Sequence, residues 1–296
     1  MKHAYLIMAH NQFYVLEVLL KLIDDERNDI FLHIDKKVSN FDFNYFKTVI
    51  KKGNLYFTKR YDVRWADISQ TMTTINILEE AIKNKQRYKY YHLLSGVDLP
   101  LKTQDQIHAF FENKNNEFIH FCSKENRKRV MGRYIYLHFF TKHLREKNIY
   151  IITRLLDNII CFFQKILNKR SNKFNNIKIR IGANWFSITE NFARYIIERK
   201  TDIERLYSHT KMADESFLQT LVYNSKFRNN LFKKGIENDD YMACLRYIDW
   251  TRGNPYVWKI EDYNRLINSD YLFARKFDEK ISKDLIDKIY NTLNKY

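Results

Sequence analysis

The chain contains few of the residues that break regular secondary structure. Only two prolines and six glycines occur among its 296 residues. This scarcity excludes a flexible linker, a collagen-like repeat and a Gly-rich low-complexity tract. The 45% hydrophobic and 16% aromatic residues exclude a disordered chain and are enough for a sizeable core. We therefore expect one continuously folded protein.

Cysteine and the common phosphate-binding motifs are also scarce. The cysteines Cys122, Cys161 and Cys244 lie far apart, which argues against a disulfide framework and against a zinc site. Because the first glycine is Gly53, neither a Gly-rich dinucleotide fingerprint nor a P-loop follows the first predicted strand. The N-terminal apolar stretch is too short for a signal peptide, and no run is long enough to span a membrane. We expect a cytoplasmic protein.

Positive charge is abundant and unevenly placed. The net charge is +16, and the segment 124–180 holds 15 Lys or Arg against three acids, or +12. Within this basic segment, "IYIITRLLDNIICFFQKIL" places most of its apolar residues on one stripe of a predicted helix, with Arg154, Asp157, Lys165 and Lys169 off the stripe. The favoured interpretation is an amphipathic helix that covers the core. The alternatives are a basic surface that rests on anionic lipid and a nucleic-acid-binding surface.

The first 35 residues predict a strand, a helix and a second strand. "AYLIMAH" is a continuous apolar run, "QFYVLEVLLKLID" has helical spacing, and "DIFLHID" is a second buried strand that ends on an acid. This order is typical of a nucleotide-binding α/β sheet, whose ligands bind beyond the carboxyl ends of the strands. Asp35 is therefore a candidate for a ribose or uracil contact, and an ordinary turn aspartate is an equally good interpretation.

Alternating elements continue along the chain. We expect strands in "NLYFTKR", "YKYYHLLSGVDLPLKT", "KIRIGANWFSIT" and "YMACLRYIDW". A helix is expected in "ADISQTMTTINILEEAIKN", capped near Asp67 or Ser69, and others in "MADESFLQTLVYN" and at the C-terminus. Asp98 lies where a strand runs into a loop, and such transitions commonly carry binding or catalytic groups.

Two adjacent carboxylates begin the apolar run of "MADESFLQT". Taken alone, Asp214 predicts a helix cap and Glu215 a favourable partner of the helix dipole, with Phe217, Leu218 and Leu221 facing the core. That interpretation needs no function. The motifs elsewhere in the chain favour a different role for Glu215.

Seven of these stretches together resemble one known family. In order, "AYLIMAHNQ", "FLHIDKK", "LLSGVDLPLKT", "GANWFSIT", "ADESFLQT", "LRYIDW" and "YLFARKFD" are similar to the core-2/I-branching β-1,6-N-acetylglucosaminyltransferases of glycosyltransferase family 14, with their xylosyltransferase relatives. The resemblance runs from the first strand to about Asp278. It implies an α/β fold of the GT-A type over 1–296, with a Rossmann-like nucleotide-sugar-binding half in 1–120 and an acceptor-binding half in 121–296.

The resemblance also implies an inverting transfer from a UDP-sugar without a metal. Glu215 corresponds to the catalytic base, which leaves Asp214 to cap and orient the turn. Lys276 and Arg252 correspond to the cations that stabilise the departing UDP; the register at Arg252 needs a one-residue shift, so Arg275 is the alternative. Since the chain has no Asp-x-Asp sequence, side-chain cations would supply the charge that a divalent metal supplies in many GT-A enzymes.

Further contacts follow from the same comparison. His10, Asp35 and Asp98 are the expected nucleotide-binding residues, although Asp98 could equally brace its loop. Trp250 is expected to stack on the acceptor sugar, for which an aromatic face is suited, while a core tryptophan is its alternative. Trp185 and Glu125 are further candidates for contacts with the acceptor.

The family's animal members carry a membrane anchor, a stem and several disulfides, and this chain has three cysteines. This difference favours a bacterial cytoplasmic enzyme, at or near the inner face of the membrane, that builds a surface polysaccharide or glycolipid. The expected donor is UDP-N-acetylglucosamine, with xylose, galactose or glucose as alternatives, and the expected acceptor is a glycan, free or lipid-linked. A basic nucleic-acid-binding protein and an inactive glycan-binding module are the competing classes; no nucleic-acid-binding motif supports the former.

Overall fold

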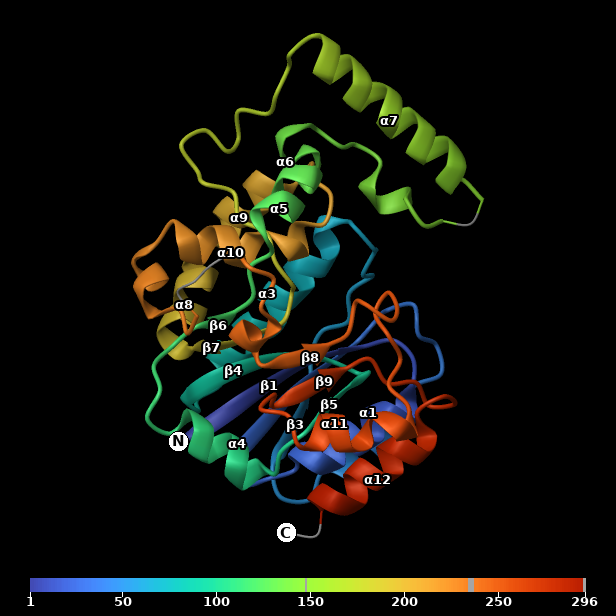
Figure 1. The fold of residues 1–296 in the computed structure, drawn as a ribbon, viewed down its shortest axis with the longest axis vertical. Helices are drawn as coiled ribbons and strands as arrows, with labels where there is room; N and C mark the ends of the chain where they lie inside the picture. Colours follow the sequence, from blue (N-terminus) through green and yellow to red (C-terminus); the bar gives the residue numbers. More distant parts are fainter. Residues whose placement is uncertain (147, 234–236, 295–296) are drawn as a thin grey trace.

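The computed structural model describes residues 1–146, 148–233 and 237–294, and its strands form two sheets. The main sheet has six strands in the order β3-β2-β1-β4-β7-β6, and the small sheet has the order β5-β9-β8 (Figure 1). The strand bounds are β1 (Lys2–Ala9), β2 (Asn28–Ile34), β3 (Asn54–Phe57), β4 (Tyr88–Ser95), β5 (Asp98–Pro100), β6 (Phe118–Ile119), β7 (Phe186–Thr189), β8 (Arg246–Ile248) and β9 (Phe273–Arg275).

Both strand directions occur in the main sheet. β1, β2, β3 and β4 are parallel, whereas β7 pairs antiparallel with both β4 and β6. The four parallel strands form the expected Rossmann-like half. Because β7 comes from the second half of the chain, the ranges 1–120 and 121–296 share one sheet. This mixed sheet with helices on both faces agrees with the α/β fold class expected from the sequence.

Helices cover both faces of the main sheet (Figure 1). Tyr5 and Ile7 of β1 belong to a core with α1 and α12, whereas Ala4 and Leu6 belong to a second core with α3 and α8. Burial on both faces explains why "AYLIMAH" is continuously apolar. The helices are α1 (Phe13–Ile23), α2 (Phe43–Val49), α3 (Ile68–Lys83), α4 (Gln104–Phe111), α5 (Lys124–Val130), α6 (Gly132–Ile135), α7 (Tyr150–Ile166), α8 (Glu190–Glu198), α9 (Lys200–Tyr207), α10 (Phe217–Tyr223), α11 (Tyr263–Ile267) and α12 (Lys283–Leu293).

Three predicted strands are shorter than expected. Of "NLYFTKR", only Asn54–Phe57 forms a strand. Of "KIRIGANWFSIT", only Phe186–Thr189 forms a strand. "YMACLRYIDW" begins as a 3-10 helix, η4 (Tyr241–Cys244), and Leu245 then adopts a left-handed conformation with φ 63° before β8 starts. The cap prediction at α3 is confirmed, because the Asp67 carboxylate accepts the Ser69 N–H at 2.9 Å.

The predicted helix in "MADESFLQTLVYN" is interrupted. A 3-10 turn, η2 (Ala213–Glu215), precedes α10, and the Glu215 carbonyl accepts the N–H of Gly182 from another segment. The capping role predicted for Asp214 is wrong, since its side chain makes no cap hydrogen bond and instead accepts from Gln70 Nε2 at 2.8 Å. Phe217 is buried as predicted, as is the neighbouring Leu218.

The helix predicted in the basic segment forms as α7, but it does not cover the core. α7 stands apart from the sheets and their helices (Figure 1), and its buried residues are the polar Thr153 and Asp157. The apolar stripe is exposed. The favoured sequence interpretation was therefore wrong, because the polar side of α7 faces the protein. Within the described ranges, every helix is too short or too polar to cross a bilayer.

A buried arginine joins the two sheets. The Arg246 guanidinium, on β8, donates to the carbonyls of Leu93 on β4 and Phe186 on β7, at 3.1 and 2.6 Å, and to Ser187 Oγ at 2.7 Å. It also donates to the Cys244 carbonyl and lies over the Phe273 ring. Burial lowers the pKa of Arg246 to about 10, so the side chain remains charged at neutral pH.

Replacing Arg246 should destabilise the fold strongly. Arg246→Met leaves several buried acceptors without a donor, so we expect the free energy of unfolding to fall by about 3–5 kcal/mol, as for other disrupted buried charged networks. Chemical denaturation monitored by circular dichroism measures this change. Arg205→Met, at a side chain 74% exposed, is the matched control and should change stability by less than about 0.5 kcal/mol. Similar stability of the two variants would contradict the role given to Arg246.

Candidate active site

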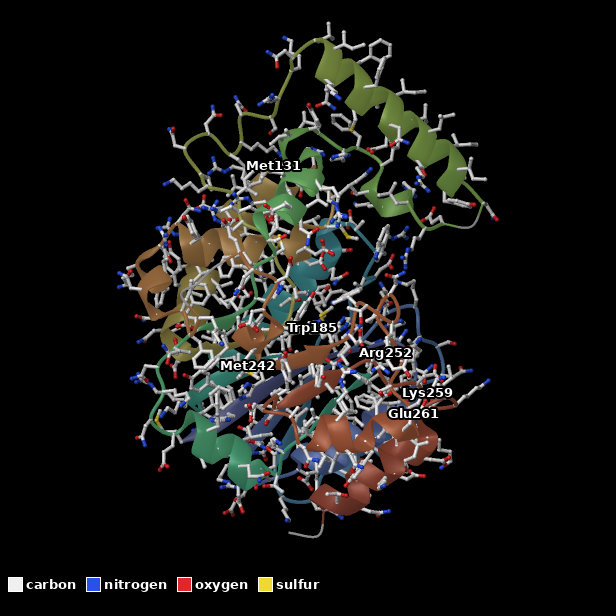
Figure 2. All side chains as sticks on the ribbon, viewed as in Figure 1. Met131, Trp185, Met242, Arg252, Lys259 and Glu261 are labelled. Atoms are coloured by element: carbon white, nitrogen blue, oxygen red, sulfur yellow. The ribbon has the colours of Figure 1, made fainter. Side chains whose placement is uncertain are left out.

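A cavity of about 520 Å³ brings several of the predicted site residues together. Glu215, Trp185, Trp250 and Arg275 all line it. These residues come from η2, the segment before β7, the loop after β8 and the end of β9. The cavity therefore lies at the ends of β8 and β9 of the small sheet, beside η2 and the start of β7. Figure 2 shows Trp185 near the centre of the molecule.

Hydrogen bonds between two of the sequence motifs position Glu215. The Gly182 N–H donates to the Glu215 carbonyl at 2.8 Å. Gln219 Nε2 donates to the Ala183 carbonyl at 2.7 Å, and Ser216 Oγ to the Arg180 carbonyl at 2.9 Å. The segment "IRIGAN" is thus fastened to "ESFLQ" on both sides of Glu215. This pairing explains why Glu215 ends a 3-10 turn and does not sit inside a regular helix.

The electrostatic surroundings of Glu215 suit a general base. Burial raises the pKa of its carboxyl above the ordinary value, and Arg133, which donates to Oε2 at 2.7 Å, limits the rise. Burial, followed by the charge of Glu215, raises the pKa of the neighbouring Asp214 to about 7. A carboxylate with a raised pKa is a stronger base while still ionised near neutral pH.

Several polar atoms around the cavity lack a protein partner. Within the described part of the chain, His120 Nε2, Asn184 Oδ1 and Asp214 Oδ1 are buried and make no hydrogen bond, and all three residues line the cavity. Buried polar atoms are normally paired. Their grouping at one cavity fits a ligand rich in hydroxyl groups.

Arg275 is the last residue of β9, the central strand of the small sheet, and it lines the cavity. Its guanidinium stacks over the Trp185 ring at 4.5 Å and donates to Asp98 at 2.9 Å. Asp98 is buried and also accepts the Ser95 N–H at 2.7 Å. Asp98 begins β5 and does not lie in the expected loop; its carboxylate braces the turn between β4 and β5 and holds Arg275, and a bracing role is the alternative that the sequence left open.

Arg252 is placed differently from Arg275. Its guanidinium donates to Asp249 at 2.6 Å and to Asp262 at 2.9 Å, and the residue is not among those that line the cavity. Figure 2 shows Arg252 to one side of Trp185, toward Lys259 and Glu261. Two carboxylates already balance its charge.

The remaining nucleotide-site candidates gather at the carboxyl ends of β1 and β2. Asp35 is buried, its N–H donates to the Ala9 carbonyl, and its carboxylate accepts from Lys37 Nζ at 3.0 Å. His10 is exposed at the end of β1; partial desolvation lowers its pKa, and the nearby charges include Asp35, Lys37 and Lys276. The Lys276 carbonyl accepts the N–H of the buried Trp258, which fixes the backbone there.

Two of the three acceptor-side candidates, Trp250 and Trp185, line the cavity. Trp250 is 48% exposed and lines the cavity, so it offers an accessible aromatic face, and the core-tryptophan alternative does not apply. Trp185 is partly covered by Arg275. Glu125 is exposed in the first turn of α5 and is not among the lining residues, whereas Asn126 and Arg129 of that helix are.

Sequence reasoning missed the other residues that shape the cavity. Arg133 lies among many basic residues in the segment 124–180, so nothing in the sequence distinguished it. His120 directly follows the short strand β6, and Tyr241 begins the 3-10 helix η4; their rings stack at 4.1 Å, and neither segment has a recognisable sequence pattern. Gly182 begins the stretch "GANWFSIT". The scarcity of glycine in this chain was the one signal in the sequence that it has a special role.

One grouping of metal-ligand types occurs in the described ranges, and the sequence spacing did not indicate it. Ligand atoms of His138, Asp157 and Cys161 lie within 4.8 Å of one another. The Lys211 ammonium lies 2.5 Å from the Asp157 carboxylate and already balances its charge. Asp157 and Cys161 belong to α7, so this group lies on the side of α7 that faces the protein. None of its residues lines the cavity.

Gly182 should be irreplaceable for a steric reason. A Cβ at this position would lie 2.0 Å from the His120 carbonyl oxygen, so Gly182→Ala must displace the backbone that holds Glu215. We expect a tenfold or greater loss of kcat from this displacement. Steady-state kinetics measures it, and Gly132→Ala, whose nearest contact would be an ordinary 3.6 Å, is the control. Unchanged kinetics in Gly182→Ala would contradict this account.

The chain is similar in sequence to known glycosyltransferases. The chain is 20% identical to dog xylosyltransferase 1 over 97% of its length, and 24% identical to a human N-acetyllactosaminide β-1,6-N-acetylglucosaminyl-transferase over 93%. It spans 30% of the former protein and 68% of the latter.

Solved structures of two glycosyltransferases resemble it weakly. Mouse xyloside xylosyltransferase 1 in its apo form has a TM-score of 0.42 at 8% identity, covering 92% of this chain and 96% of its own. The galactosyltransferase LgtC, solved with donor and acceptor sugar analogues, has a TM-score of 0.40 at 10% identity, covering 98% and 96%. The decisive match is to a family model, described as the core-2/I-branching enzyme, over residues 3–266. The chain belongs to the core-2/I-branching enzyme family of glycosyltransferases.

Proposed function

We propose that this protein transfers N-acetylglucosamine from its UDP-sugar to a glycan hydroxyl with inversion to a β-linkage. The observation that carries the proposal is the placement of Glu215, with a raised pKa, in one cavity with the exposed face of Trp250. The printed names of the matched relatives include both a xylosyltransferase and a β-1,6-N-acetylglucosaminyl-transferase. The role proposed is synthesis of a surface polysaccharide or glycolipid.

In the proposed reaction Glu215 removes the proton of the acceptor hydroxyl. The acceptor oxygen attacks the anomeric carbon from the face opposite the diphosphate, the new carbon–oxygen bond forms, and the bond to the diphosphate breaks. UDP leaves with the electron pair of that bond. The partial burial of Glu215 supports this role, because desolvation raises the pKa of the carboxyl and makes the carboxylate more basic, while Arg133 favours the ionised form and orients it.

Side-chain cations would stabilise the negative charge on departing UDP. Lys276 is the proposed principal cation, since it lies near His10 and Asp35 at the carboxyl edge of the parallel strands. The geometry favours Arg275 over Arg252 as its partner, because Arg275 lines the cavity whereas two carboxylates hold Arg252. His10 and Asp35 are the proposed contacts of the nucleoside, and Trp250 is the proposed platform for the acceptor sugar.

The alternatives differ mainly in the sugar. Xylose, galactose or glucose could replace N-acetylglucosamine within the same scheme, and the similarity to xylosyltransferase 1 favours testing xylose first. An inactive glycan-binding module would keep the Trp250 platform and show no turnover. A nucleic-acid-binding function has no support in the cavity, which contains acids at Asp214, Glu215 and Asp239.

A donor screen tests the proposed function directly. The protein is incubated with UDP-N-acetylglucosamine, UDP-xylose, UDP-galactose and UDP-glucose, each with and without EDTA, and UDP release is measured. We expect release from one donor, undiminished by the chelator, because side-chain cations replace the metal. No release from any donor, even with added Mn²⁺ and a panel of acceptors, would contradict the transferase proposal; dependence on Mn²⁺ would contradict metal independence.

Glu215→Gln tests the base with the donor that the screen identifies. We expect kcat to fall by about 10²–10⁴-fold, since the amide cannot accept the proton, while the Kd of UDP changes less than twofold. In the wild-type enzyme, kcat should fall as the pH drops through the raised pKa of Glu215. Glu204→Gln, at an exposed position on α9, is the matched control. Near-normal turnover in Glu215→Gln would show that another group is the base.

The two candidate arginines can be separated by UDP affinity. Lys276→Ala and Arg275→Ala should each weaken UDP binding by about tenfold, as expected for the loss of a charge-assisted contact to phosphate. Arg252→Ala should have a smaller effect, because two carboxylates hold Arg252 outside the set of cavity-lining residues, whereas Arg275 has one carboxylate partner and lines the cavity. Isothermal titration calorimetry measures the Kd values, and Lys280→Ala, exposed four residues beyond Lys276, is the control. Weaker binding in Arg252→Ala than in Arg275→Ala would reverse the assignment.

A further inference from the structure

The outward side of α7 is an exposed apolar face, which we call the α7 face. Nine large side chains of this helix are between 40% and 65% exposed. They are Tyr150, Ile151, Ile152, Leu155, Leu156, Ile159, Phe162, Phe163 and Ile166. Side chains along the helix point away from the rest of the molecule (Figure 2). A continuous apolar surface of this kind marks an interaction site.

Specific polar contacts hold the other side of α7 against the protein. The buried Asp157 pairs with Lys211 at 2.5 Å and with His138 at 3.0 Å. Burial alone would raise the pKa of Asp157, but these two partners outweigh it and lower the pKa below its ordinary value. Gln164 exchanges two hydrogen bonds of 2.9 Å with the backbone of Leu137. The helix is thus oriented by its polar side, with its apolar side outward.

Cationic residues border the α7 face. At 100° per residue, Arg154 and Lys165 lie together along one edge of the apolar face, and both are exposed. Lys169 and Arg170 follow the helix and are also exposed. Asp157 is the single acid of α7, and it is buried and neutralised. The outer surface therefore combines apolar side chains with positive charge.

We propose that α7 docks flat on an anionic lipid surface, with its apolar side chains among the acyl chains and Arg154 and Lys165 among the headgroups. Seventeen residues give a helix of about 25 Å, which suits a position in the plane of the interface. A second copy of this chain is a poorer occupant, because two α7 faces in contact would bring their cationic edges together without an acid to pair them.

Docking through α7 would hold the cavity in a fixed orientation relative to the lipid surface. Lys211, which holds Asp157 of α7, lies four residues before Glu215, and its N–H donates to the carbonyl of Arg133, the partner of Glu215. The same contacts therefore fix both α7 and the base. We infer that the acceptor is lipid-linked; this second step rests on the proposed function, whereas docking itself does not.

Vesicle flotation tests docking without relying on activity. The full chain is mixed with vesicles of phosphatidylcholine alone or with 30% phosphatidylserine. We expect binding to the anionic vesicles and at least tenfold weaker binding to the neutral ones. The double variant Phe162→Glu/Ile166→Glu should lose at least tenfold in affinity, and Arg154→Gln/Lys165→Gln about fivefold for each charge removed. Ile281→Glu and Lys51→Gln/Lys85→Gln, at exposed positions outside α7, are the matched controls.

The outcomes separate docking from its alternatives. Sedimentation of the wild-type chain as a monomer without vesicles supports docking, whereas a dimer that Phe162→Glu/Ile166→Glu dissociates would assign the α7 face to a second copy. Absent vesicle binding, or binding equal in the α7 variants and their controls, would overturn the proposal. UDP release measured on the same samples is independent of flotation, so failure of the proposed function can be distinguished from failure of docking.

Discussion

The architecture depends on one charge buried between two sheets. Arg246 spans the gap between β8 of the small sheet and β4 and β7 of the main sheet, and it bonds to backbone oxygens in place of a carboxylate partner. A planar guanidinium with five donors can satisfy several fixed acceptors at once, which a lysine could not. The small sheet carries Arg275 and leads into Lys276. The register of Arg246 therefore sets where both cations stand relative to the parallel strands.

Local patterns predicted the elements that build the parallel half of the main sheet. Continuous apolar strands and amphipathic helices are written in neighbouring residues, so β1, α1, β2 and α3 were predictable, as was the Asp67 cap. Contacts between distant segments were not. The bond from Gly182 to the Glu215 carbonyl interrupts a helix that local propensity favours, and it removes the cap expected at Asp214. Nothing near residue 215 in the sequence reports a partner 33 positions away.

Amphipathicity revealed that α7 would form, but not which side would face the protein. The same stripe of apolar residues fits a core-covering helix and a surface helix, because periodicity fixes the faces of a helix and not their surroundings. Asp157 decided the outcome, since its partners His138 and Lys211 come from elsewhere in the chain. Arg275 illustrates the same limit: its contacts with Asp98 and Trp185 come from distant segments, and nothing in the sequence around residue 275 indicates them.

The polar attachment of α7 also separates two parts of the molecule. Because residues 150–166 contribute no side chain to either hydrophobic core, their apolar composition is free of the packing constraints that govern the sheets. Sequence drift there alters only the outer surface, as long as Asp157 and Gln164 keep their partners. The part of the protein that meets its surroundings can thus change without disturbing the part that carries out chemistry.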